Sequence, residues 1–205
     1  MTERPGAQEW VPPTDDLAAL REAAQGCRGC ELWQDATQTV FGDGPAPAAL
    51  MLVGEQPGDK EDLAGEPFVG PAGRILHEAL AAAGIEPERV YVTNAVKHFR
   101  FEQRGKRRIH EKPQVAHITA CHPWLESELA AVQPETIVCL GATAARSVLG
   151  RSVRIGQERG VRQEAHGRDV VVTVHPAAIV RVRDHDERER AFALFVADLR
   201  VAARS

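Results

Sequence analysis

The chain has 205 residues, of which 43% are hydrophobic and 26% are charged, a composition that fits a folded globular protein and excludes a disordered one. The formal net charge of −4 argues against a protein that coats nucleic acid non-specifically. No apolar run approaches the roughly 18 residues of a membrane span, and Met1–Gly6 lacks a signal-peptide pattern, so we expect a cytoplasmic protein without a membrane partner.

The spacing of apolar residues predicts alternating helices and strands in a single domain, 1–205, with a loose N-terminal segment over residues 1–14. In chain order we expect a helix at 15–25, a strand at 48–53, a helix at 73–83, a strand at 90–96, helical structure at 114–132 with a break or kink at Pro123, a strand at 136–140 with a helix through Leu149, a strand at 169–174 and a helix at 187–203. This order predicts an α/β fold with a four-stranded, mostly parallel sheet covered on both faces.

Ligands of such sheets bind beyond the carboxyl ends of the strands, so the residues just after each strand are the candidate site. These residues are Gly54–Asp59, Asn94–His98, Gly141–Thr143 and His175–Ile179.

Glu55 and Gln56 supply a carboxylate and an amide that can position a water or another side chain, although a solvated turn is an equally good interpretation of the same residues. Asn94 offers both a donor and an acceptor to a nucleobase edge, but a lone Asn at a strand end is more often a cap.

The segment 66–76 predicts a loop that enters a helix. Gly70, Gly73 and the free amides of that helix are candidates for binding a phosphate. Phe68 is a candidate stacking platform, although a core position is the more common role for such a residue.

His175 follows the last strand, where an imidazole could donate to an oxygen that gains negative charge. The apolar Ile179 and Val180, next to Arg181, could wedge into a base stack while the arginine pairs with phosphate. A structural histidine and a helix start are the alternatives.

Residues 97–112 hold seven Lys or Arg against two Glu, which predicts contact with phosphates. The pair Cys27 and Cys30 has the CxxC spacing, which by itself is compatible with a metal site, a redox pair or chance.

Together these segments resemble the iron–sulfur uracil-DNA glycosylases over residues 27–200. The resemblance is carried by GEQPGD, EPFVGPAGR, VYVTNAVKHF, ACHPWL, LGATAA and VTVHPAAI, in that order. The basic segment KRRIH, residues 106–110, resembles the UdgX branch, whose members excise uracil and then become covalently joined to the abasic sugar.

The resemblance implies a three-layer α/β/α sandwich and a monomeric enzyme acting on uracil-containing DNA, single-stranded and also double-stranded, with free uracil as a product. It implies catalytic roles for His110 as nucleophile, Glu55 as its carboxylate partner, Gln56 as an orienting group and His175 as donor to the leaving uracil. Uracil-binding residues would be Gln56, Asp59, Phe68, Asn94 and His175, and DNA-binding residues would be Gly70, Gly73, Lys106, Arg107, Arg108, Ala178, Ile179 and Arg181. The alternatives are a turnover glycosylase with a merely basic loop, a non-catalytic sensor of uracil-DNA, and a CxxC thiol oxidoreductase.

The resemblance also implies a [4Fe–4S] cluster held by Cys27, Cys30, His98 and Cys121. Because His98 stands where the wider family has cysteine, Cys139 is the alternative fourth ligand, although its apolar strand context suits a small core residue. Three Cys and one His would suit zinc equally well.

Overall fold

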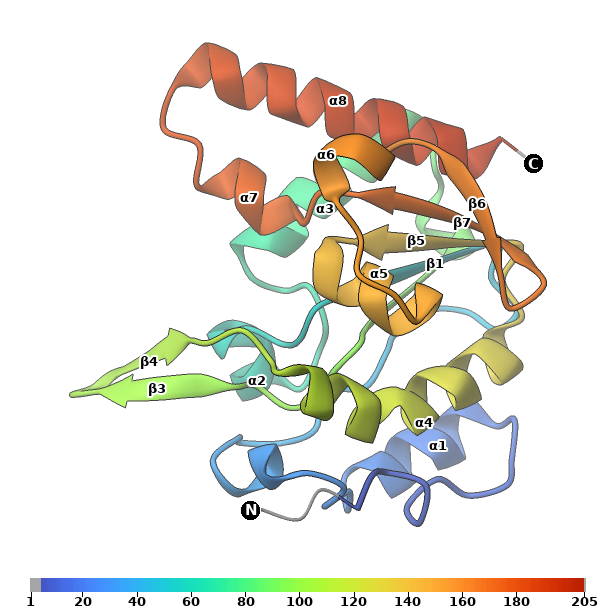
Figure 1. Ribbon diagram of the computed structural model, residues 1–205, viewed down its shortest axis with the longest axis vertical. Helices are drawn as coiled ribbons and strands as arrows, with labels where there is room; N and C mark the ends of the chain where they lie inside the picture. The colour runs from blue at the N-terminus through green and yellow to red at the C-terminus, as the bar shows by residue number, and fades with distance from the viewer. Residues whose placement is uncertain (1–4, 205) are drawn as a thin grey trace.

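The computed structural model describes residues 5–204, and its centre is a five-stranded sheet with the order β2-β1-β5-β7-β6 (Figure 1). The strands are β1 (Leu50–Gly54), β2 (Val90–Asn94), β5 (Thr136–Leu140), β6 (Arg162–Ala165) and β7 (Arg168–Thr173). The first four in the sheet order run parallel, and β6 pairs antiparallel with β7. The prediction of four strands is wrong by one, because the sequence of β6, RQEA, is polar and forms a sheet edge that no apolar pattern indicates.

The sheet is the middle of three layers, with α3 (Pro71–Ala83) and α8 (His185–Ala203) on one face and α4 (Val115–Val132) and α5 (Ala142–Leu149) on the other (Figure 1). Side chains along β1 alternate between these layers: Leu50 and Leu52 join the α3–α8 core, and Met51 and Val53 join the α4–α5 core. The strands are therefore buried on both faces, as the expected sandwich requires.

Local sequence signals explain where the main helices begin and end. Pro71 begins α3, and Gly84, with φ 75°, ends it in the left-handed conformation that glycine adopts without strain. The Asp184 side chain caps α8 by accepting the amide hydrogen of Glu187. Helix α4 continues through Pro123 as one element, so the expected new segment at this proline is not formed. The shorter helical elements are α1 (Leu17–Ala24), a 3₁₀ turn (Glu31–Gln34), α2 (Asp59–Ala64), a 3₁₀ turn (Pro87–Arg89), α6 (Ile155–Glu158) and α7 (Pro176–Val180).

The N-terminal part of the chain packs on the outer side of α4 and forms a third apolar cluster around Trp124. Ala7 is 1% exposed, and its amide donates to the carbonyl of Ala120 at 2.7 Å. The expectation of a loose segment is therefore wrong for Gly6 onward, whereas residues 1–4 lie outside the described part.

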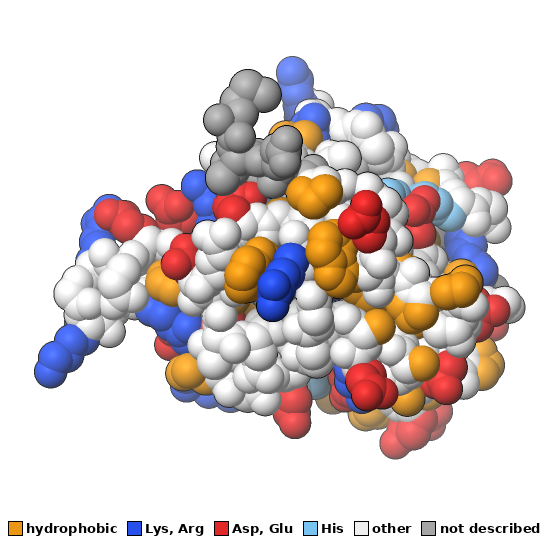
Figure 2. Space-filling model, turned by 90° about the horizontal axis from the view of Figure 1, so that it is seen from below, with side chains coloured by type: hydrophobic (Ala, Val, Ile, Leu, Met, Phe, Trp, Pro, Cys, Tyr) orange, Lys and Arg blue, Asp and Glu red, His pale blue; other side chains and the backbone are white. Residues whose placement is uncertain are grey.

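The chain between β2 and α4 forms a two-stranded hairpin, β3 (Phe101–Arg104) and β4 (Arg107–His110), which projects from the body of the protein (Figure 1). Seen from below, the projection carries Lys and Arg side chains out to its tip (Figure 2). The basic segment that the sequence suggested as a loop is thus an ordered arm. Among the described residues, no helix combines the length and apolar character needed to cross a membrane.

Candidate active site and cluster site

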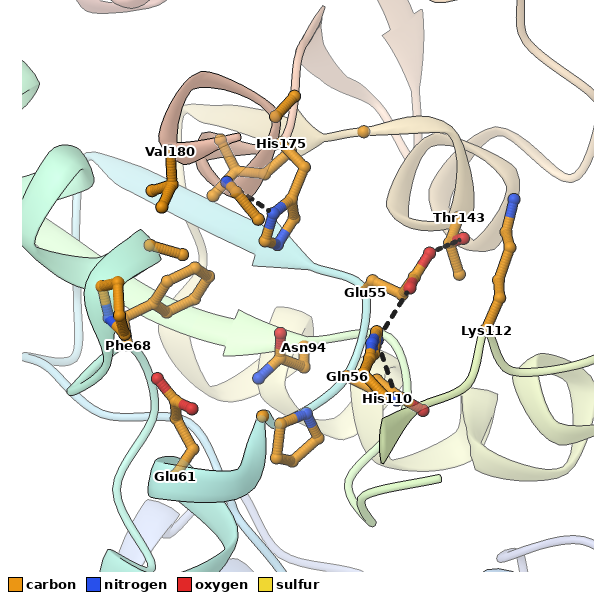
Figure 3. Close-up of a pocket in the computed structure, with 18 of the residues that line it drawn as sticks. Glu55, Gln56, Glu61, Phe68, Asn94, His110, Lys112, Thr143, His175 and Val180 are labelled. Atoms are coloured by element: carbon orange, nitrogen blue, oxygen red, sulfur yellow. Dashed lines mark hydrogen bonds and ion pairs between the residues drawn. The ribbon is translucent and has the colours of Figure 1, made fainter. Parts of the chain in front are cut away.

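A cavity of about 430 Å³ opens at the carboxyl ends of the parallel strands, where the sequence placed the candidate site. Its lining includes residues that follow β1, β2, β5 and β7, together with His110 from the hairpin (Figure 3). All seven predicted catalytic and uracil-binding residues are therefore brought together in one place: Glu55, Gln56, Asp59, Phe68, Asn94, His110 and His175.

Asn94 and Phe68 form the inner end of this cavity (Figure 3). Asn94 is 3% exposed, and its side-chain Oδ1 has no hydrogen-bond partner in the described structure. An unpaired buried amide oxygen costs free energy, so this position suits a ligand that supplies an N–H. Gly54 allows the convergence, because a Cβ there would lie 2.3 Å from Asn94 Oδ1 and 2.8 Å from Phe68 Cζ.

His175 faces the same space from the opposite side, with its ring 6.4 Å from the Phe68 ring and nearly parallel to it. Its Nδ1 accepts the amide hydrogen of Ala177 at 3.2 Å. Burial, together with the positive charge of Arg181 and the neighbouring His110, lowers the pKa of His175 to about 4. The imidazole is therefore neutral near pH 7, with its hydrogen on Nε2 and available to an acceptor in the cavity.

Glu55 connects two elements at the mouth of the cavity (Figure 3). Its Oε2 accepts a hydrogen bond from the Thr143 hydroxyl, and its Oε1 lies 3.4 Å from His110 Nε2. Burial lowers the pKa of His110, the Glu55 carboxylate opposes this effect, and Arg181 adds to it. His110 therefore stays neutral to lower pH than a solvated histidine.

Gln56 is committed to the base of the hairpin. Its amide nitrogen donates to the carbonyls of Arg100 at 3.1 Å and Glu111 at 3.0 Å, and its oxygen accepts the amide hydrogen of Arg100 at 3.2 Å. Both amide hydrogens are thereby used, although Nε2 also lies 3.1 Å from His110 Nε2. Gln56 therefore holds the arm that carries His110, and its side chain is not free to bind uracil.

Asp59 and Arg108 pair with each other. Arg108 Nε donates to Asp59 Oδ1 at 2.6 Å, and its Nη1 donates to the buried Asp62 at 2.5 Å. These side chains fix the hairpin to α2, and the roles of Asp59 in uracil binding and of Arg108 in DNA binding stay predictions. Lys106 and Arg107, by contrast, are exposed at the outer end of the arm.

The glycines predicted to bind phosphate contribute to packing. The Gly70 amide donates to Glu61 Oε1 at 2.7 Å, so a carboxylate of the protein already occupies the start of α3. Gly73 is buried beneath Phe68, where a Cβ would lie 1.6 Å from the Phe68 carbonyl oxygen. These contacts give Gly70 and Gly73 a role in packing, and their assignment to DNA binding stays a prediction.

The sequence placed the apolar wedge at Ile179 and Val180, and the structure separates these two residues. Ile179 is 1% exposed and belongs to the core between α7, α3 and the sheet. Val180 is 42% exposed and lines the cavity, with Ala178 and Arg181 beside it on the rim (Figure 3).

Sequence reasoning assigned no role to Thr143 or Glu61, although both line the cavity. Thr143 follows β5, so its place after a strand was the available signal. Glu61 lies in a polar helix, α2, and nothing in the pattern distinguishes it from Asp59 or Asp62.

A second group of predicted residues lies beneath the hairpin, in the apolar cluster around Trp124. Cys27, Cys30 and Cys121 are all buried there. The pKa of the Cys121 thiol is raised to about 12, chiefly by burial and also by the neighbouring Cys30 and Cys27, against the opposing effect of Lys97. Cys139 lies apart from them, on β5 within the α4–α5 core.

His98 has the protonation pattern of a metal ligand. The Thr39 hydroxyl donates to the carbonyl of Ala24 at 2.8 Å, so its oxygen must accept the hydrogen of His98 Nε2 at 2.9 Å. Burial lowers the pKa of His98 to about 4, against the opposing effect of Asp62. The ring is thus neutral with a lone pair on Nδ1, and a hydrogen bond on the other nitrogen is the usual support of a ligating histidine.

The spacing of these donors fits a cluster better than a single ion. Among the described residues, no three of the four donor atoms lie within 4.8 Å of one another. A tetrahedral zinc site with bonds of about 2.3 Å would bring its sulfur atoms to about 3.8 Å apart. In a [4Fe–4S] cluster each ligand binds a different iron and the ligands stand farther apart, and three thiols with a neutral imidazole are donors that can hold such a cluster.

Comparison with known protein families identifies the family of the chain. The sequence profile of the Uracil DNA glycosylase superfamily matches residues 41–200. The chain belongs to the uracil DNA glycosylase superfamily. Its matched region includes every strand and every residue of the cavity described above.

Similar members of the superfamily come from archaea and bacteria. A type-4 uracil-DNA glycosylase of Archaeoglobus fulgidus is 37% identical over 175 residues, which cover 81% of this chain and 84% of that protein. One from Thermotoga maritima is 35% identical, covering 84% and 87%, and one from Pyrobaculum aerophilum is 33% identical, covering 81% and 85%.

Proposed function

We propose that this protein is an iron–sulfur uracil-DNA glycosylase that binds a flipped uracil in the cavity and excises it. The observation that carries the proposal is the buried, unpaired Asn94 Oδ1 in the cavity that Phe68 and His175 also line. Uracil N3–H would satisfy this oxygen, and the Asn94 amide hydrogens would donate to a uracil carbonyl. Phe68 would contribute the aromatic surface for stacking.

His175 would assist departure of the base. As the glycosidic bond breaks, its electron pair stays on uracil and negative charge develops on O2. The neutral imidazole would donate its Nε2 hydrogen to that oxygen, and the hydrogen bond from Ala177 to Nδ1 keeps this tautomer in place. Arg181 would add positive charge beside the leaving group while also reaching a phosphate.

The rim and the hairpin would bind the DNA strand. Val180 is positioned to fill the space that a flipped base leaves in the stack, and Lys106 and Arg107 can pair with phosphates along the arm. The same groups suit a single strand and a duplex.

We further propose that His110 captures the abasic sugar. It lines the cavity, its partial burial lowers its pKa and so favours the neutral ring, and Glu55 Oε1 faces Nε2 at 3.4 Å. With hydrogen on Nε2, the lone pair is on Nδ1. That pair would form the bond to C1′ as the pair of the glycosidic bond leaves with uracil, and Glu55 would stabilise the positive imidazole that results.

The relatives described above favour the simpler alternative, in which water attacks C1′ and the enzyme turns over, because they are named type-4 uracil-DNA glycosylases. Glu55 would then orient the water, and the arm would only bind DNA. What supports capture is the ordered placement of His110 by Gln56 and Arg108.

The iron–sulfur cluster would have a structural role. Once bound to Cys27, Cys30, His98 and Cys121, it would join the N-terminal segment, the end of β2 and α4. These segments support Asn94 from below, since the Lys97 side chain donates to the Asn94 carbonyl at 2.7 Å and the Lys97 amide donates to Cys121 Sγ at 3.3 Å.

The test uses a uracil-containing oligonucleotide, a thymine control and a denaturing gel. Free uracil together with a heat-stable protein–DNA band supports excision and capture, and His110→Gly should remove the band while releasing uracil. Free uracil without a band refutes capture and leaves the turnover enzyme. Reversible binding without free uracil refutes the glycosylase proposal in favour of a non-catalytic sensor.

A further inference from the structure

Thr143 is the hydrogen-bond donor that the described structure gives to Glu55, and it comes from a different element. Its hydroxyl donates to Glu55 Oε2, while Oε1 faces His110. Thr143 is 3% exposed, so water does not compete for this bond. Figure 3 shows the three side chains in line, with the carboxylate in the middle.

The backbone directs this hydroxyl toward the cavity. Thr143 is the second residue of α5, which begins after Gly141 with φ 96°. The Gly141 amide donates to the carbonyl of Thr173 at 2.9 Å and so fixes the helix start between β5 and β7. Threonine deeper in a helix commonly bonds a carbonyl of the preceding turn. At the first turn that alternative is absent, and the hydroxyl bonds across to Glu55 instead.

The Glu55 carboxylate can rotate about the bond that joins it to the side chain, and its two oxygens are chemically alike. Glu55 is 22% exposed, so an unrestrained carboxylate could turn toward solvent. The Thr143 bond fixes one oxygen and thereby presents the other to His110.

We propose that Thr143 is a positioning residue that holds the Glu55 carboxylate in its working orientation. The inference rests on the proposed function for its effect on rate, but the contact itself belongs to the protein without DNA. The role applies whether Glu55 supports His110 or orients a water.

Thr143→Val retains the shape of the side chain and removes its donor, whereas Thr143→Ser retains the donor. Loss of a hydrogen bond to a charged group predicts a single-turnover excision rate about 10-fold to about 100-fold lower in Thr143→Val. Thr143→Ser should restore the rate to within about threefold of wild type. A thermal midpoint shared by the three proteins excludes a general loss of folding.

A double-mutant cycle separates positioning from a structural role. In a Glu55→Ala background there is no carboxylate to hold, so Thr143→Val should change the rate by less than about twofold. An equal loss in both backgrounds would overturn the proposal.

Titration of the His110 imidazole by NMR tests the contact without any activity. The groups that face His110 are Glu55, Arg181 and His175, and only Glu55 raises its pKa. Release of Glu55 in Thr143→Val should therefore lower the His110 midpoint, and Thr143→Ser should leave it unchanged. A midpoint unmoved in Thr143→Val overturns the inference. A wild-type protein that releases no uracil would instead refute the proposed function, and the titration would still decide the role of Thr143.

Discussion

Replacing Gln56 tests whether covalent capture depends on the hydrogen bonds that hold the hairpin, and with it His110, in place. The Gln56 amide makes three hydrogen bonds to the backbone of Arg100 and Glu111, and the side chain is buried. Gln56→Leu retains approximate size and removes all three bonds. Arg100 and Glu111 still bond each other, through the Glu111 amide and the Arg100 carbonyl at 3.0 Å, so the hairpin itself stays closed. What is lost is its attachment to the end of β1.

The size of the effect follows from these bonds. At about 1 kcal/mol for each neutral hydrogen bond, the loss amounts to about 3 kcal/mol. Each 1.36 kcal/mol is a factor of about ten, so covalent capture should slow by about 100-fold. Excision should fall by less than about tenfold, because Asn94 at the end of β2 and His175 just after β7 do not depend on the arm, and water can attack C1′ where His110 is displaced.

The assay follows free uracil and the protein–DNA band in the same single-turnover reaction. Gln103→Leu is the matched control, since it removes an exposed glutamine from β3 of the same hairpin. Gln56→Glu retains the acceptor for the Arg100 amide but cannot donate to either carbonyl, so it should resemble Gln56→Leu. Excision and capture that decline in parallel would refute the reasoning, because the hairpin would then have no separate role.

Four further outcomes follow. Covalent capture should persist below pH 6.5, the usual pKa of histidine, because the attacking nitrogen must be neutral and the pKa of His110 is lowered. Rates of capture measured from about pH 5 to about pH 8 test this, and half-loss at or above pH 6.5 would contradict it. Asn94→Ala should reduce single-turnover excision by about 100-fold or more, and a normal rate would exclude Asn94 from uracil binding. Ile179→Ala should lower the free energy of unfolding, measured by denaturation, by about 2–4 kcal/mol. Val180→Ser should change it by less than about 0.5 kcal/mol and should weaken oligonucleotide binding. The reverse pattern would make Ile179 the wedge. Cys139→Ala should retain the visible absorbance of the cluster, and a colourless protein would make Cys139 a ligand.

The parallel core could be predicted because β1, β2, β5 and β7 consist of apolar residues buried on both faces. The location of the cavity followed from this order, since parallel strands place their carboxyl ends together. Strand β6 could not be predicted, because its side chains are polar and only the pairing with β7 makes it a strand.

Parts of the candidate site could not be predicted because they depend on contacts between residues that are far apart in the sequence. Gly70 has the sequence of an anion-binding helix start, but Glu61 occupies its amide. Ile179 and Val180 are equally apolar, and in a helix as short as α7 the pattern cannot show which faces the core. The lone pair of His98 depends on Thr39, fifty-nine residues away, so only the folded chain reveals it.

The hairpin that carries His110 is hydrogen-bonded as a separate two-stranded sheet, and the central sheet is complete without it. Gln56, Asp59 and Asp62, which hold it, all lie in the one segment between β1 and α3. The arm could therefore be shortened or exchanged without rebuilding the central sheet. A lineage could therefore change the fate of the abasic sugar, from release to retention, by altering one surface arm and the few side chains that hold it.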